Sequence, residues 1–218
     1  MTIIVAVIGG PGSGKSTLCT ALARHYIAAG QDVDHFEEQE ILTRPDFSKV
    51  ASEFANGAGS VAPQTLIAAF AQYVDRSLAN DIDLVITDAL IPFIPSLLVW
   101  GHSETQIEQV IAELEKVSAT ATVIVILLVG DPALTLPRAI DREGEGWFES
   151  YVHKLSRWPG ASHVVDLSTA IDQLRHEADL SRRLVSRSTW ELLEIDATSD
   201  PDTLIETAQR KLDAILPT

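Results

Sequence analysis

The stretch GGPGSGKS, residues 9–16, is the part of the sequence that decides the fold. It matches the pattern G-x-x-x-x-G-K-[ST], in which backbone amides of a glycine-rich turn surround phosphate oxygens. An apolar run at residues 3–8 precedes it, and a helix-like stretch at residues 16–29 follows it. Because the pattern is specific when it joins a strand to a helix, the sequence predicts a phosphate-binding loop.

The residue types in this loop also predict its ligands. Lys15 can reach the β- and γ-phosphates of a nucleoside triphosphate, and the Ser16 hydroxyl can ligate Mg²⁺. We therefore expect ATP and Mg²⁺ as cofactors. The residues expected to bind the nucleotide are Gly9, Pro11, Gly12, Ser13, Gly14, Lys15, Ser16 and Thr17.

Composition limits the class of protein and its partners. The 218 residues suit one α/β domain with a large core, and Cys19, the single cysteine, is expected inside that core. No apolar run is long enough to cross a membrane, and no signal peptide is recognisable, so a cytoplasmic protein is expected. The net charge of −15 argues against nucleic-acid and anionic-membrane partners, but it is compatible with a small-molecule substrate.

Strand-like and helix-like stretches alternate along the chain, which predicts a parallel sheet with helices on both faces. The expected strands cover residues 3–8, 32–36, 82–87, 122–129 and 191–195. The expected helices cover residues 16–29, 64–79, 104–118, 132–142, 147–157, 169–187 and 201–215. Asp200-Pro201 is a favourable start for the last helix. Residues 43–63 show little periodicity and predict a mobile loop, which either contacts a substrate or is an ordinary surface loop.

Several carboxylates stand where phosphoryl transfer would need them. Asp88 follows the strand at 82–87 and could hold Mg²⁺ or the acceptor, or it could be a solvated strand-end residue. Glu37 and Glu38 follow the strand at 32–36, and either could orient the attacking hydroxyl and accept its proton. The alternative is an exposed acidic run that opens a helix. Asp131, which precedes Pro132, is expected mainly to cap a helix.

Basic and aromatic side chains complete the predicted site. Arg138 and Arg142 share one helix face and could close over the γ-phosphate, or they could be surface ion-pair residues. Lys154 and Arg157, on the next helix, are weaker candidates. The six histidines are scattered without the spacing of a metal site. The aromatic residues that could wall a nucleobase pocket, or else belong to the core, are Phe70, Tyr73, Phe93 and Trp100.

The order of these pieces resembles the thymidylate kinase and deoxynucleoside kinase group of P-loop kinases. The matching positions are the loop at 9–17, Glu37 or Glu38, Asp88, and the stretch LLVGDP at 127–132 that leads to RAIDRE at 138–143. The resemblance implies a P-loop NTPase fold over residues 1–218, with strand order 2-3-1-4-5. It further implies a lid at about 138–157 that closes on ATP, and a segment at about 37–80 that could bind the acceptor.

Two departures from that group affect the expected acceptor. The group usually has arginine directly after the strand-end acid, whereas this chain has Asp88-Ala89-Leu90. Arg44 could substitute for it. An extra helix also lies within residues 158–190, near Arg182, Arg183 and Arg187, and it could pack against a second subunit. Without the usual arginine, an uncharged hydroxyl is the favoured acceptor.

The leading hypothesis is an ATP-dependent kinase that phosphorylates a nucleoside or a nucleoside-like small molecule, such as an antibiotic or a biosynthetic intermediate. Its catalytic residues would be Lys15, Glu37 or Glu38, Asp88, Arg138 and Arg142, with Ser16 and Asp88 as metal ligands. A nucleoside monophosphate kinase is the alternative within the same class. The alternative from another class is a regulatory P-loop NTPase, although no N-K-x-D sequence for guanine recognition is present.

Overall fold

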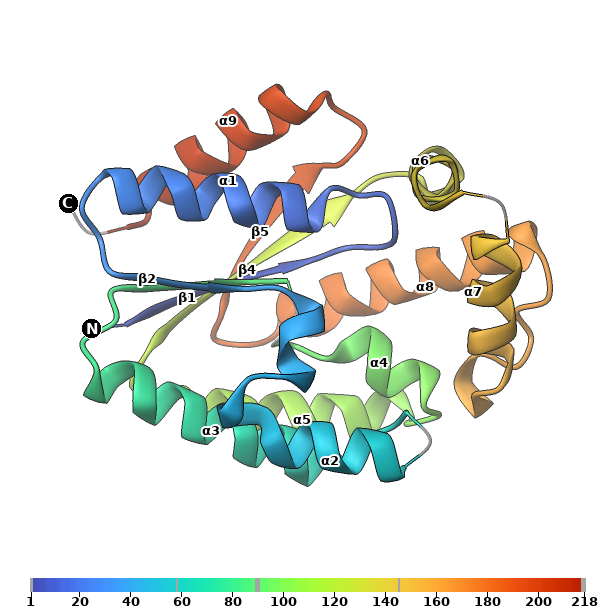
Figure 1. Ribbon diagram of the computed structural model, residues 1–218, viewed down its shortest axis with the longest axis horizontal. Coiled ribbons are helices and arrows are strands. Elements are labelled where there is room, and N and C mark those ends of the chain that lie inside the picture. The colour runs from blue at the N-terminus through green and yellow to red at the C-terminus, as the bar shows by residue number, and fades with distance from the viewer. Residues whose placement is uncertain (1, 58, 89–90, 145, 217–218) are drawn as a thin grey trace.

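A five-stranded parallel sheet with the order β2-β3-β1-β4-β5 forms the centre of the molecule (Figure 1). The computed structural model describes residues 2–57, 59–88, 91–144 and 146–216. The strands are β1 (Ile3–Ile8), β2 (Val33–Phe36), β3 (Leu84–Thr87), β4 (Thr122–Val129) and β5 (Glu191–Asp196). Every neighbouring pair is parallel. The predicted α/β class and strand order are therefore confirmed.

Helices cover both faces of the sheet, as expected (Figure 1). On one face, α1 (Lys15–Ala28) and α9 (Pro201–Asp213) pack together and bury an apolar cluster that includes Cys19. On the other face lie α3 (Pro63–Ala79), α5 (Glu104–Val117) and α8 (Leu167–Val185). Because both faces are covered, the central strand β1 is buried along its whole length and contains only apolar residues.

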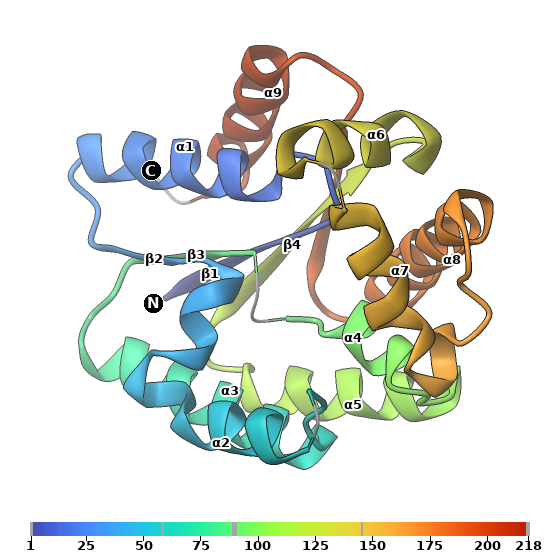
Figure 2. The same ribbon diagram turned by 45° about the vertical axis from the view of Figure 1, so that its right-hand side comes forward.

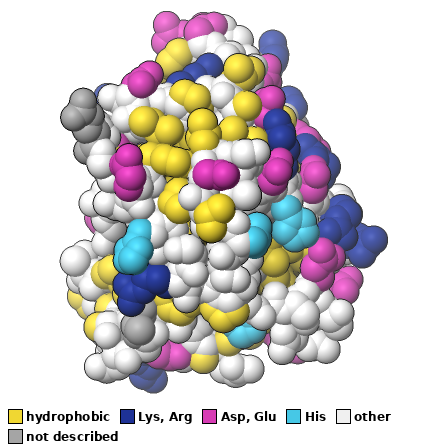
Figure 3. All heavy atoms as spheres, turned by 90° about the vertical axis from the view of Figure 1, so that its right-hand side faces the viewer, with side chains coloured by type: hydrophobic (Ala, Val, Ile, Leu, Met, Phe, Trp, Pro, Cys, Tyr) yellow, Lys and Arg dark blue, Asp and Glu magenta, His cyan; other side chains and the backbone are white. Residues whose placement is uncertain are grey.

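A third group of helices lies beside the carboxyl-terminal ends of the strands (Figures 1 and 2). It comprises α4 (Ile94–Val99), α6 (Pro132–Glu143) and α7 (Trp147–Ser156). These helices share a small apolar core with the start of α8, centred on Leu136, Val164 and Leu174. Figure 3 looks onto this end of the molecule and shows hydrophobic side chains gathered in its upper half, with acidic and basic side chains around them.

The predicted helix starts at two aspartates are confirmed. The Asp131 carboxylate accepts a hydrogen bond of 3.1 Å from the Ala133 amide at the start of α6. The Asp200 carboxylate accepts one of 3.0 Å from the Thr203 amide at the start of α9. Each cap satisfies an amide that has no partner within its helix.

Residues 43–63 differ from the expectation of an irregular loop. They contain a short 3₁₀ turn, η2 (Pro45–Phe47), and the helix α2 (Ser48–Asn56), preceded by η1 (Glu38–Leu42). Phe47 and Val50 are 1 % and 5 % exposed and join the core beneath α3, with Phe54 packed against it. The spacing of these three apolar residues is helical, and their burial stabilises a helix that is too short to form by itself. Ala58 lies outside the described residues.

The extra helix α8 packs within the chain. Its buried residues include Leu174 in the first half of the helix and Leu180, Leu184 and Val185 in the second half, and the two groups enter different apolar clusters. The buried apolar residues of α8 thus have partners within the chain. A homodimer through α8 stays a prediction. None of the helices in the described part of the chain combines the length and apolar character of a membrane span.

Candidate active site

The loop after β1 adopts a conformation that its glycines make possible. Gly12 and Gly14 have φ values of 75° and 91°, in the left-handed region where a side chain is strained. A Cβ atom at Gly12 would also overlap the carbonyl oxygen of Thr135 in α6. The sequence therefore allows the loop to turn sharply while α6 packs directly against it.

The N-terminal end of α1 presents unpaired backbone amides beside this loop. The first bond within the helix is donated by the Leu18 amide to the Gly14 carbonyl, at 2.9 Å, which leaves the amides of Lys15, Ser16 and Thr17 without a helical acceptor. Lys15 Nζ donates to the carbonyls of Gly9 and Gly10, at 2.9 and 3.4 Å. Together with the helix dipole, these groups form a local positive site in an acidic protein.

The Ser13 side chain adds an orphaned polar atom to the loop. It is 4 % exposed, and its hydroxyl has no hydrogen-bond partner among the described residues. Buried hydroxyls are nearly always paired, so this one is suited to pair with a bound ligand or with water.

Asp88 links the loop helix to the segment after β2. Its Oδ2 accepts a hydrogen bond of 2.8 Å from the Ser16 hydroxyl, and its Oδ1 accepts one of 2.9 Å from the Glu38 amide. The strand order explains this meeting, because β3 lies between β1 and β2. The two residues predicted to hold a metal are thus in contact.

The oxygen donors of Ser16 and Asp88 fit Mg²⁺, which prefers oxygen ligands. No cluster of three or more histidine, cysteine or acidic residues suited to a metal is found within the described ranges. A cation at this point would therefore need further oxygens from phosphate groups and water, as Mg²⁺ commonly does. Ser16 and Asp88 are suited to a magnesium–nucleotide complex rather than to a metal held by protein side chains alone.

A cavity of about 750 Å³ opens beside the loop, among α2, α4, α7 and α8. Its aromatic lining residues are Phe54, Trp100, Tyr151 and Trp158. Its charged lining residues are Lys15, Glu38, Lys154, Arg157 and Glu177. A cavity with aromatic walls and a few converging charged groups is typical of a small-molecule site.

A second, apolar cavity of about 390 Å³ lies between η1, α2 and α3. The residues that line both cavities are Glu38, Phe54, Ser96, Trp100 and Lys154. Of the aromatic residues singled out from the sequence, Trp100 lines both cavities and Phe93 lines the second. Phe70 and Tyr73 belong to the core instead, where they are 0 % and 1 % exposed.

The two candidate arginines of α6 lie outside the main cavity. Arg138 donates to the backbone carbonyls of Ala197 and Thr198, at 2.8 and 3.2 Å, and so fastens α6 to the loop after β5. Arg142 is 67 % exposed and pairs with the adjacent Glu143. The cations that line the cavity are instead Lys154 and Arg157, the weaker candidates from the sequence. Neither side chain makes an ion pair or a hydrogen bond with the described part of the chain.

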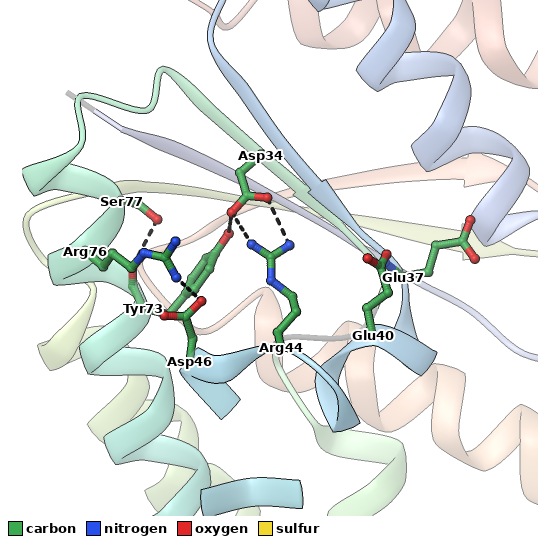
Figure 4. Close-up of polar contacts among 8 residues, drawn as sticks. All are labelled: Asp34, Glu37, Glu40, Arg44, Asp46, Tyr73, Arg76 and Ser77. Carbon is green, nitrogen blue, oxygen red and sulfur yellow. Dashed lines mark hydrogen bonds and ion pairs between the residues drawn. The ribbon is translucent and has the colours of Figure 1, made fainter. Parts of the chain in front are cut away.

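The structure separates Glu37 from Glu38. Glu38 lines both cavities, whereas Glu37 does not. The Glu37 amide donates to the Glu40 carboxylate at 2.9 Å (Figure 4). Of the two glutamates, Glu38 is positioned to contact a molecule in the cavity.

Arg44 is held in a cluster of polar side chains (Figure 4). Its guanidinium donates to both Asp34 oxygens, at 3.0 and 2.6 Å, and lies 4.5 Å from the centre of the Phe36 ring. Asp34 also accepts a hydrogen bond of 2.6 Å from the Tyr73 hydroxyl. Burial and this bond raise the pKa of Tyr73. The cluster ties the segment after β2 to the sheet and to α3, and Arg44 lines neither of the two cavities.

Glu177 is a site residue that the sequence analysis did not identify. It lines the main cavity from α8, and burial raises its pKa to about 7 against opposing contributions from Gln173 and Lys15. On sequence alone it is one acidic residue in a helix rich in charges. Its proximity to the loop depends on how α8 packs, which no local pattern records.

Comparison of the chain with protein-family models finds no matching family, and comparison with curated protein sequences finds no match. The geometry of the site is therefore the basis for assigning a function.

Proposed function

We propose that this protein is an ATP-dependent kinase that phosphorylates a hydroxyl group of a nucleoside or a nucleoside-like small molecule. The observation that carries the proposal is the contact between Ser16 and Asp88 at the glycine-rich loop, beside a 750 Å³ cavity. A nucleotide-kinase-like P-loop fold, the finer class within α/β, belongs to the same proposal. The order of the parallel strands supports it.

In this mechanism the loop binds the triphosphate. The amides of residues 15–17 and the Lys15 ammonium attract the phosphate oxygens, and Lys15 exchanges its backbone acceptors for them. Mg²⁺, when bound with the nucleotide, neutralises phosphate charge. Ser16 and Asp88 would hold it through oxygen atoms.

The cavity would bind the acceptor between the loop and α7. Its aromatic side chains offer flat apolar faces for a ring, and the adjoining apolar cavity leaves room for a substituent. Glu38 would hydrogen-bond the acceptor. Burial in the cavity would also limit attack by water on the nucleotide, which is a general requirement of kinases. Ala89, at the position where the group that the chain resembles usually has arginine, lies outside the described residues.

The test is an assay of ADP release with Mg-ATP, first without acceptor and then with panels of nucleosides, nucleoside monophosphates and nucleoside-like natural products. Stimulation by a nucleoside-type hydroxyl, lost in Lys15→Ala and kept in the surface control Lys116→Ala, is expected. Hydrolysis that depends on Lys15 but that no acceptor stimulates would contradict the proposal and favour a regulatory NTPase.

A nucleoside monophosphate kinase is a second candidate, favoured by one observation. Lys154 and Arg157 line the cavity without acidic partners in the described ranges, and unpaired cations suit an acceptor phosphate. They would equally suit the terminal phosphate of ATP. Turnover with monophosphates alone, abolished in Arg157→Ala, would decide for the second candidate.

A further inference from the structure

Glu177 projects from α8 toward the glycine-rich loop. It lines the main cavity together with Gly9, Gly10 and Lys15. Helix α8 is close to the loop at this level, because a Cβ atom at Gly10 would lie 3.3 Å from the Leu174 side chain. Leu174 is one helical turn before Glu177, so the packing that seats Leu174 also sets the position of Glu177.

The surroundings of Glu177 keep its carboxyl ready to accept a hydrogen bond. Its Oε1 accepts a hydrogen bond of 2.9 Å from the side-chain amide of Gln173, which is 2 % exposed. No ion pair within 4 Å involves Glu177 in the part of the chain that is described. The carboxyl therefore retains acceptor capacity toward the cavity.

Charged and titratable groups face the same space from α1, η1, α7 and α8. They are Lys15 of α1, Glu38 of η1, Glu177 of α8, and Tyr151, Lys154 and Arg157 at α7. Burial raises the pKa of Tyr151, and the charge of Glu177 raises it further. Burial raises the pKa of Glu177 to about 7, although Gln173 and Lys15 oppose that shift. A general base is most effective when its pKa is near the working pH.

We propose that Glu177 accepts the proton of the acceptor hydroxyl during phosphoryl transfer. The inference rests on the proposed function and names the base for it. The hydroxyl oxygen forms a bond to the γ-phosphorus of the nucleoside triphosphate, and the bond from that phosphorus to the bridging oxygen breaks. The electron pair of the broken bond leaves with ADP, and the hydroxyl proton goes to the Glu177 carboxylate.

The other carboxylates are less suited to this step. Both oxygens of Asp88 already accept bonds, from Ser16 and from the Glu38 amide. Glu37 does not line the cavity. Glu38 does, but it also borders the apolar second cavity and is therefore better placed to hold the acceptor than to accept its proton.

The experiment compares Glu177→Gln with Glu38→Gln and with the control Glu206→Gln. Glu206 is an exposed residue of α9 whose side chain makes no hydrogen bond or ion pair with the described part of the chain. ADP release is measured from pH 5.5 to pH 9 with the nucleoside or nucleoside-like hydroxyl compound of the panel that gives the highest wild-type turnover. Ionisation of the nucleotide is common to all four proteins, so differences between their profiles come from the protein.

For Glu177→Gln we expect a kcat at least 100-fold lower, a KM for ATP within twofold of wild type, and loss of the rise in activity around pH 7. Glu38→Gln should mainly raise the KM for the acceptor and keep that rise. A Glu177→Gln protein with kcat within threefold of wild type, or with an unchanged pH profile, overturns the inference. If no hydroxyl compound stimulates the wild-type protein, the proposed function fails, and the inference fails with it.

Discussion

The Ser16 hydroxyl donates a hydrogen bond of 2.8 Å to the Asp88 carboxylate, although the two residues are 72 positions apart in the chain. Ser16 lies in the first turn of α1, just after the loop that follows β1. Asp88 directly follows the adjacent strand β3. Parallel neighbouring strands end at the same edge of the sheet, so the contact follows from the strand order.

Replacing Asp88 with asparagine should weaken magnesium-dependent nucleotide binding by about tenfold or more, because the site loses its anionic oxygen. Titration calorimetry with ATP, in the presence and absence of Mg²⁺, measures the effect. The exposed Asp75 of α3 offers a matched control, Asp75→Asn. An Asp88→Asn protein whose ATP affinity responds to Mg²⁺ as the wild type does would remove Asp88 from the metal site.

The cations of α6 and α7 should differ in their effect on turnover. Lys154→Ala and Arg157→Ala should each lower kcat/KM about tenfold, since each removes a charged hydrogen-bond donor from the cavity. Arg142→Ala should change it less than twofold, because Arg142 is exposed and pairs with Glu143. Steady-state kinetics decides, with Arg210→Ala in α9 as the control. Equal losses in Arg142→Ala and Arg157→Ala would contradict this ranking.

Removal of the Arg44 side chain should destabilise the fold. Arg44→Ala leaves the half-buried Asp34 carboxylate without its cation and removes the guanidinium that lies over the Phe36 ring. We expect a loss of about 2–3 kcal/mol in the free energy of unfolding, measured in urea. Arg44→Lys should recover only part of it, because lysine cannot bond both carboxylate oxygens in the same geometry. Arg24→Ala, an exposed change in α1, should be nearly neutral.

Glu177 should make the stability of the ligand-free protein depend on pH. Its pKa is about 7 in the folded protein and 4.5 in the unfolded chain, so folding favours the protonated form. The contribution of Glu177 to the free energy of unfolding is therefore most favourable below about pH 4.5, and it is lost as the pH rises through 7. Glu177→Gln should therefore match the wild type near pH 4.5 and exceed its free energy of unfolding by about 2–3 kcal/mol at pH 8.

Urea unfolding of Glu177→Gln, Glu206→Gln and wild type at both pH values tests this linkage without any substrate. Equal stability differences at pH 4.5 and pH 8 would mean that Glu177 ionises normally. Because no nucleotide is present, such a result would concern only the ionisation of the Glu177 carboxyl. The proposed kinase activity is tested separately, by the ADP-release assay.

Local patterns in the sequence determined most of the secondary structure. The apolar runs at residues 3–8 and 122–129 are β1 and β4, and the predicted cap at Asp200 begins α9. The helix α2 was missed because its apolar spacing is short and its stability comes from burial against α3. The strand order came from the family resemblance, and the structure confirms it.

The sequence by itself determined the glycine-rich loop, the candidate metal pair Ser16 and Asp88, and the presence of cations after β4. Only the tertiary structure decided which side chains share a cavity. In the folded chain Glu177 lies beside the loop, Arg44 forms an ion pair with Asp34, and Arg138 donates hydrogen bonds to backbone carbonyls. The physical reason is that a motif records contacts between near neighbours, whereas a cavity is formed by helices whose relative positions depend on the packing of the whole core.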